Sequence, residues 1–155
     1  MCQSLTACLD FLYNSKNNVS KVCNNFSIDE LYSIRANKTA PGMTFKEALK
    51  YLRHHGLNGE KINSYAKLTS VTATKYAIMM FGPIVCGFPV YTSLPHFWRK
   101  PGRFQGGHAV TLVGYNKDGF IVRNSWGSKW ADEGHSVIPY SEFKENCFEA
   151  WTITL

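Results

Sequence analysis

Apolar side chains recur at helical spacing in the first half of the chain. Between residue 2 and about residue 15, the apolar members of the pattern are Leu5, Cys8, Leu9, Phe11 and Leu12. The period is close to that of an α-helix, and the polar run NSKNNVSK ends it. The pattern predicts a mostly buried first helix.

Further helices are predicted before residue 82. Residues 27–30 (SIDE) have the form of a capping box, in which a serine side chain accepts a hydrogen bond from the first helical turn. Residues 45–55 (FKEALKYLRHH) form an amphipathic pattern that stops at Gly56, and residues 72–81 (TATKYAIMMF) continue the helical texture. The first half is therefore predicted to be mainly helical.

The second half has the texture of β-strands. Five apolar or alternating runs are typical of strands: residues 84–88, 108–115, 120–123, 137–138 and 151–155. Between two of them, residues 116–119 (NKDG) are a strong signal for a hairpin turn. Helices followed by an antiparallel sheet make an α+β fold, in which a cleft between the halves is natural.

Composition limits the size of the fold and the kind of partner. The 155 residues suit one compact domain or two small lobes, and 45% hydrophobic with 18% charged residues is typical of a folded chain with a real core. The net charge of +6 is scattered, so no window forms a basic arm for nucleic acid. We expect a basic solvated surface and no nucleic-acid partner.

Cysteine and histidine spacing gives no sign of a metal site or a disulfide framework. The five cysteines are an odd number without a CxxC pair, and His54 with His55 lacks ligand spacing, so we expect mostly reduced thiols, no metal and no cofactor. The opening MCQSLTACLDFLY lacks the pattern of a signal peptide, and no apolar run is long enough to span a membrane. An intracellular or virion-associated setting is favoured.

His108 is the histidine with the most informative context. It follows Gly106 and Gly107 and is predicted to open a strand, where the missing glycine side chains leave room for a ligand. A lone histidine is more often an ordinary core or surface residue, as we interpret His54, His55, His96 and His135. The neighbouring sequence must therefore decide.

That neighbouring sequence is GGHAVTLVGYNKDGFIVRNSWGSKW, and it resembles papain-like cysteine peptidases. The residues that carry the resemblance are His108-Ala109-Val110, Val113-Gly114-Tyr115, Asn124-Ser125-Trp126-Gly127 and Trp130. The resemblance implies a single papain-like domain over residues 1–155. Its helical lobe, about 1–75, would pack against an antiparallel sheet or barrel lobe, about 76–155, with the active-site cleft between them.

The resemblance also implies a chemistry. A thiol becomes a good nucleophile when a histidine accepts its proton, and an amide side chain can hold the other ring nitrogen of that histidine. By resemblance, His108 is the base, Asn124 orients it, and the Trp126 indole excludes water from their contact. An ideal ladder around the NKDG turn does not place Asn124 opposite His108, so a diagonal approach or a bend is required.

Two registers compete for the nucleophile. In the first, Cys2 is the nucleophile at the start of the first helix, where the helix dipole lowers a thiol pKa. In the second, Ser4-Leu5-Thr6-Ala7 aligns with the Ser-Cys-Thr-Ala string of the family. Leu5 then stands at the position of the nucleophile, and the protein would be catalytically inactive. We favour Cys2, because the second register would bury Asn14 and Ser15. Cys8 lies inside the helix on its apolar side and is a poor candidate.

The family's oxyanion-hole glutamine has no counterpart at the expected place. It stands about six residues before the nucleophile in the family, whereas this chain begins one residue before Cys2, and Gln3 lies on the wrong side. Either the natural beginning is missing, another donor serves, or the activity is weak or absent.

Fainter similarity, in family order, extends over nearly the whole chain. It implies that Gly42 lines the acyl side of the cleft and that Ala109 with Val85 or Cys86 lines an apolar specificity pocket. Each of these residues is equally well explained by core packing.

The leading hypothesis is a cysteine endopeptidase that hydrolyses polypeptides through Cys2, His108 and Asn124. The alternative is an inactive papain-like fold that serves as a structural or protein-binding module. Transglutaminase-like acyl transfer, or hydrolysis of an isopeptide or a small amide, would use the same constellation.

Overall fold

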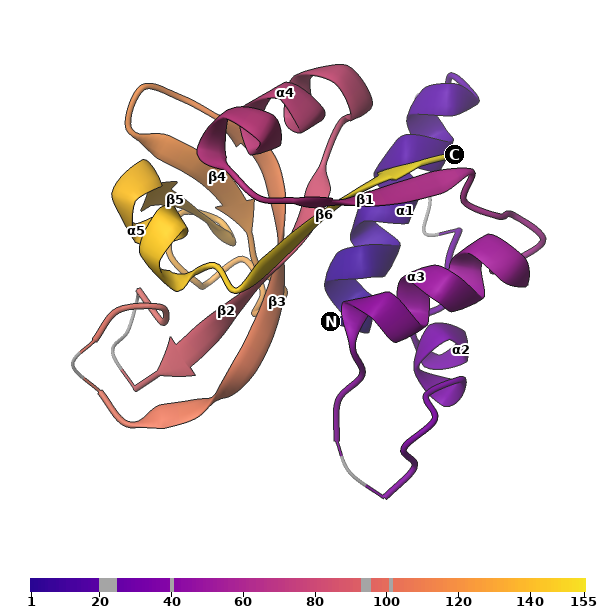
Figure 1. Ribbon diagram of the computed structural model, residues 1–155, viewed down its shortest axis with the longest axis horizontal. Coiled ribbons are helices and arrows are strands. Elements are labelled where there is room, and N and C mark those ends of the chain that lie inside the picture. The colour runs from indigo at the N-terminus through magenta and orange to yellow at the C-terminus, as the bar shows by residue number, and fades with distance from the viewer. Residues whose placement is uncertain (20–24, 40, 93–95, 101) are drawn as a thin grey trace. The chain divides into compact units, whose positions relative to one another are not determined.

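A computed structural model describes residues 1–19, 25–39, 41–92, 96–100 and 102–155, and Figure 1 shows its helices and strands. Contacts divide the chain into two compact units. We call Met1–Ala66 with Ile153–Leu155 the helical unit, and Lys67–Thr152 the sheet unit. Cys23 lies outside the described residues.

The helical unit contains α1 (Cys2–Lys16), α2 (Ile28–Ser33) and α3 (Phe45–His54). The predicted first helix is confirmed, but its predicted burial is wrong at one end. Leu5, Cys8 and Leu9 are buried, whereas Phe11 is 51% exposed and Leu12 is half-buried. In the first nine residues of α1 polar as well as apolar positions are buried, and only the face of Gln3 and Ala7 is not, whereas the residues from Phe11 to Lys16 are half-buried or exposed.

Side-chain caps explain where α2 and α3 begin. The Ser27 and Thr44 hydroxyls accept hydrogen bonds from the backbone N–H groups of Glu30 and Glu47, each at 3.2 Å, which satisfies donors that the first turn leaves free. The predicted stop at Gly56 is also confirmed. Its φ is +84°, and a Cβ there would lie 2.5 Å from the Glu60 carbonyl oxygen, so only glycine fits.

The sheet runs in the order β1-β6-β2-β3-β4-β5 within the described residues. Its strands are β1 (Ser64–Leu68), β2 (Ile84–Tyr91), β3 (Phe104–Tyr115), β4 (Gly119–Arg123), β5 (His135–Pro139) and β6 (Glu149–Thr154). The pairings of β2, β3, β4, β5 and β6 are antiparallel. The α+β prediction is therefore confirmed.

Three details of the sheet differ from the sequence-based expectation. Strand β3 begins at Phe104, so His108 lies inside the strand rather than opening it. Strand β1 and helix α5 (Tyr140–Asn146) were not predicted from the sequence. Helix α4 (Val71–Phe81) matches the prediction and packs against β3, while α5 packs against β4 and β5 (Figure 1).

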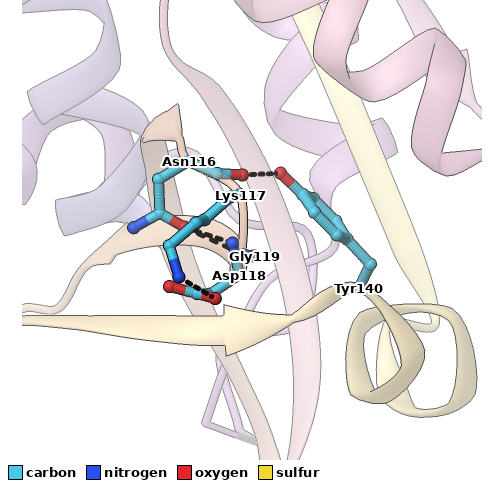
Figure 2. A network of polar contacts seen from close by, with 5 residues as sticks. All are labelled: Asn116, Lys117, Asp118, Gly119 and Tyr140. Carbon is cyan, nitrogen blue, oxygen red and sulfur yellow. Dashed lines mark hydrogen bonds and ion pairs between the residues drawn. The ribbon is translucent and has the colours of Figure 1, made fainter.

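The predicted NKDG hairpin turn joins β3 to β4, as Figure 2 shows. The Asn116 side-chain oxygen accepts from the backbone N–H groups of Asp118 at 2.8 Å and Gly119 at 3.0 Å. The Tyr140 hydroxyl, at the start of α5, donates to the Asn116 carbonyl. Local asparagine bonds and one contact from α5 therefore hold the turn.

A β-bulge lies one step beyond this turn. Gly114 pairs with Ile121, but Leu112 pairs with Val122, so Val113 is an extra residue on β3. The bulge lets Phe120 and Val122 face the same side as Leu112 and Val110. That side forms the core of the sheet unit together with residues of α4, α5, β2, β5, β6 and the segments after β2 and β4: Ala77, Ile84, Cys86, Phe88, Phe97, Trp98, Trp130, Ile138, Phe143 and Ala150.

Candidate active site

The structure brings His108 and Asn124 into direct contact. The His108 Nε2 and the Asn124 Oδ1 are 2.8 Å apart, although sixteen residues separate the two positions in the chain. Because an amide oxygen can only accept, Nε2 carries the hydrogen and donates it. The neutral ring then has its lone pair on Nδ1, which is left as a proton acceptor.

The bulge at Val113 makes this contact possible. If this sequence paired regularly from the turn, with Val113 opposite Val122, Asn124 would stand opposite Thr111, on the face away from His108. With the bulge, the Thr111–Arg123 pair places Asn124 beside Val110, and His108 is then its diagonal neighbour on the same face. The diagonal approach expected from the sequence is what the structure shows.

Aromatic rings enclose the contact. The Trp126 indole stacks on the His108 ring, with centroids 4.8 Å apart and planes at 28°. Phe97 meets the same imidazole edge to face at 5.3 Å and also contacts Trp126 at 5.1 Å. Trp126 is 41% exposed whereas Phe97 is fully buried, so one ring covers the histidine and the other supports it.

Phe97 is a site residue that sequence reasoning missed. It lies in the segment that follows β2, where no periodic pattern or motif marks it. The two residues after Phe97 bind Glu142 on α5. The Trp98 indole N–H donates to the Glu142 carboxylate at 2.6 Å, and the Arg99 guanidinium forms an ion pair with it at 2.8 Å. Helix α5 therefore braces the ring that supports His108.

Burial sets the charge of the histidine. It lowers the pKa of His108 below its ordinary value of 6.5, and the hydrogen bond to Asn124 opposes this by raising the pKa. Burial has the larger effect, so the imidazole is neutral at pH 7. A neutral ring with a free Nδ1 is the form that can accept a proton.

The loop after β4 fixes the amide that faces His108. Asn124 is 8% exposed, its backbone N–H donates to the Gly134 carbonyl at 2.9 Å, and its Oδ1 also accepts from the Ser125 N–H at 2.8 Å. Two donors therefore converge on one amide oxygen and set its direction.

Cys2 and Leu5 both lie in the first turns of α1, in the helical unit. Cys2 is 5% exposed and its Sγ lies 4.0 Å from the Met43 Sδ, while Leu5 is fully buried. Burial raises the pKa of Cys2, and the positive chain terminus partly opposes this. Burial also raises the pKa of Cys8, to about 12, so Cys8 stays protonated at neutral pH.

The expected substrate-lining residues are distributed as follows. Gly42, in the helical unit, has φ +95° and donates its N–H to the Tyr32 hydroxyl at 3.2 Å. Val85 and Ala109 lie on the same face of the β2–β3 ladder, opposite to the core face, and both are buried. The Cys86 side chain belongs to the core of the sheet unit. Of the two alternatives on β2, Val85 is thus the one on the face of Ala109.

The family model described as papain family cysteine protease matches residues 10–150. The chain belongs to the papain family. The match leaves Cys2 and Leu5 outside, so family membership does not choose between the two nucleophile registers.

Curated relatives of this papain-family chain are mainly cathepsin B-like. It is 31% identical to cathepsin B-like cysteine proteinase 3 of Ostertagia ostertagi over 99 residues, which are 58% of this chain and 54% of that protein. It is 40% identical to an uncharacterized peptidase C1-like protein of Acanthamoeba polyphaga mimivirus over 78 residues, 43% of this chain and 25% of that one. The chain thus spans about half or less of the length of these relatives.

Solved structures show the same fold. A procathepsin B from Trypanosoma congolense matches with a TM-score of 0.78 and 18% identity, covering 99% of this chain and 67% of that one. The bromelain protease from Ananas comosus matches with a TM-score of 0.71 and 16% identity, covering 99% and 87%. At these identities the likeness concerns the papain-like fold alone.

Two further observations concern the described residues. None of their helices is long and apolar enough to cross a membrane. They also contain no group of three or more histidine, cysteine or acidic side chains placed to hold a metal ion.

Proposed function

We propose that this papain-family chain hydrolyses peptide bonds of polypeptides with Cys2 as nucleophile, His108 as base and Asn124 as the residue that orients the base. The observation that carries the proposal is the 2.8 Å contact between His108 Nε2 and Asn124 Oδ1. It occupies one ring nitrogen with a donated hydrogen and leaves Nδ1 as the acceptor that a thiol needs.

The proposed reaction uses each group in turn. The Cys2 thiol gives its proton to His108 Nδ1, and the thiolate attacks the substrate carbonyl carbon. His108 then returns the proton to the leaving amine, which leaves an acyl group on the sulfur. Water attacks this thioester while His108 again accepts a proton, and the acid is released with Cys2 restored.

The raised pKa of Cys2 makes the histidine essential in this mechanism. A buried thiol stays protonated by itself at neutral pH, so the thiolate must be formed by transfer to His108 and held as an ion pair. Trp126 would keep water from the His108–Asn124 contact. Gly42, Ala109 and Val85 would line the substrate-binding surface.

The test is selective alkylation at pH 6, where an ordinary thiol reacts slowly with iodoacetamide. We expect rapid labelling of Cys2, located by peptide mass spectrometry, and loss of this labelling in the His108→Ala variant. The matched control is His54→Ala, which removes an exposed histidine of the helical unit and should leave labelling unchanged. Equal labelling of Cys2 in the wild type and in His108→Ala would refute the assignment.

The alternative is an inactive papain-like module with Leu5 in the nucleophile's place. It is motivated by the string SLTAC (4–8) and by the complete burial of Leu5. In a Cys2→Ala background, the Leu5→Cys variant tests it. A thiol at position 5 that alkylates rapidly and only while His108 is present supports the module; a thiol that stays inert supports Cys2.

A further inference from the structure

The sheet unit contains a cavity of about 290 Å³. It is lined by residues of 67–71 and 143–150, and His108 is not among them. Its lining includes the apolar residues Val71 at the start of α4, Phe143 on α5 and Phe148 in the segment between α5 and β6. Cys147, the residue that caps α5, also lines it and is half-buried. One thiol therefore faces a space that small solutes can enter.

A second thiol, that of Cys86, lies on the neighbouring strand β2. The Phe148 N–H donates to the Gly87 carbonyl at 3.1 Å, which joins the chain neighbours of Cys147 and Cys86. Cys86 pairs with Ala150 across β2 and β6, and Cys147 packs against the core cluster that contains Cys86. The two side chains thus approach each other from adjacent segments.

The environments of the two sulfurs are unequal. Cys86 is fully buried, and burial together with a hydrogen bond to Cys147 raises the pKa of Cys86 well above its ordinary value. The Cys147 Sγ donates to the Glu149 carbonyl at 3.3 Å, and Cys147 is half-buried and lines the cavity. An oxidant from solvent therefore meets Cys147 first, while Cys86 is placed to react with whatever forms there.

We propose that Cys147 and Cys86 form a dithiol that a small peroxide oxidises to a disulfide. In the first step the Cys147 sulfur attacks one peroxide oxygen and the O–O bond breaks, giving a sulfenic acid and, with hydrogen peroxide, one water. In the second step the Cys86 sulfur attacks the Cys147 sulfur, the S–O bond breaks, and the Cys86 proton leaves with the hydroxyl as a second water. Two thiols are oxidised and one peroxide is reduced.

The product would tie β2 to the corner between α5 and β6. The Phe148–Gly87 hydrogen bond already joins this corner to β2, so the disulfide would add a covalent link where the two segments are in contact. The proposal uses neither Cys2 nor His108, so it stands or falls independently of peptidase activity.

The experiment treats the Cys2→Ala protein with hydrogen peroxide and digests it with trypsin without reductant. We expect peptides 76–99 and 145–155 to appear joined, with the loss of two hydrogen atoms, and the oxidised protein to melt roughly 5–10 °C higher. In a Cys86→Ala variant the sulfenic acid at Cys147 should persist and be trapped by dimedone. Cys8→Ala is the matched control and should leave the joined peptides unchanged.

Two results would overturn the proposal. One is that Cys147 is carried to sulfinic or sulfonic acid in the wild type while Cys86 stays reduced. The other is that dimedone fails to label Cys147 in the Cys86→Ala variant although both proteins keep the circular dichroism spectrum of the folded chain.

Discussion

At the scale of single residues, the direction of the His108–Asn124 hydrogen bond carries most of the chemistry. The amide oxygen receives the Nε2 hydrogen, so the ring has one defined tautomer and one free nitrogen. Trp126 and Phe97 hold the ring plane from two sides. The proton-accepting role is therefore a property of four side chains rather than of the histidine alone.

The Asn124→Ala variant tests this arrangement. Because the hydrogen bond to Asn124 raises the pKa of His108 against the effect of burial, its removal should lower that pKa further. The measurement is an NMR titration of the imidazole carbon-bound protons. Asn37→Ala, an exposed substitution in the helical unit, is the control and should leave the titration of His108 unchanged; an equal or higher pKa in Asn124→Ala would contradict the assigned contact.

At the scale of elements, one extra residue on β3 decides which face of the sheet Asn124 occupies. Side chains alternate between faces, so a shift of one residue exchanges the two faces. Because Val113 has no partner on β4, the pairing register changes by one residue between the hairpin turn and the site. The bulge therefore links the turn geometry to the histidine–asparagine contact.

Deleting Val113 should remove the bulge and keep the contact. Leu112 then adjoins Gly114 in the chain, so the Leu112–Val122 and Thr111–Arg123 pairs are retained and Asn124 stays on the face of His108. The pKa of His108 should therefore stay above that of Asn124→Ala, in the deletion variant and in Val113→Ala alike. An NMR titration of both variants checks this, and a deletion variant whose His108 pKa falls as in Asn124→Ala would count against this register.

Helix α5 acts on the site through the segment that carries Phe97. The Glu142 carboxylate receives the Trp98 N–H and pairs with Arg99, so its replacement should loosen this segment. We expect Glu142→Gln to lower the free energy of unfolding by about 1 kcal/mol, because the amide keeps one acceptor but loses the ion pair. Urea denaturation measures the change. Glu145→Gln, an exposed neighbour on α5, should change it by much less.

At the scale of the whole molecule, His108 and Glu142 should make the stability depend on pH in different windows. The folded pKa of His108 is below its ordinary value of 6.5, so the folded state binds fewer protons and loses stability as the pH falls from about 6.5 through the folded pKa. The pKa of Glu142 is lowered first by its hydrogen bond to Arg99, so the stability it contributes is present above its ordinary value of 4.5 and is lost below it.

Denaturation at a series of pH values separates the two windows. His108→Gln should flatten the dependence just below pH 6.5, whereas Glu142→Gln should flatten it only below pH 4.5. A His108→Gln protein with the pH profile of the wild type between 5 and 6.5 would show that His108 titrates in the fold as it does in the unfolded chain.

Much of the fold was predictable because its signals are local. Ser27, Thr44 and Gly56 act within a few residues of themselves, and the NKDG turn is held mainly by its own asparagine. The short β1 and α5 were not predictable, since they exist through pairing and packing with distant segments. The early start of β3 and the exposure of Phe11 have the same origin.

The sequence by itself determined the family, through residues 106–130, and named His108 and Asn124 as partners. Only the tertiary structure decided that they meet, because the contact depends on where β3 places its extra residue, and the shared core of Val110, Leu112 and Val122 selects that place. It also decided the support from Phe97 and the approach of Cys86 to Cys147, since each joins two different segments of the chain. Contacts of this kind follow from packing, for which no short motif exists.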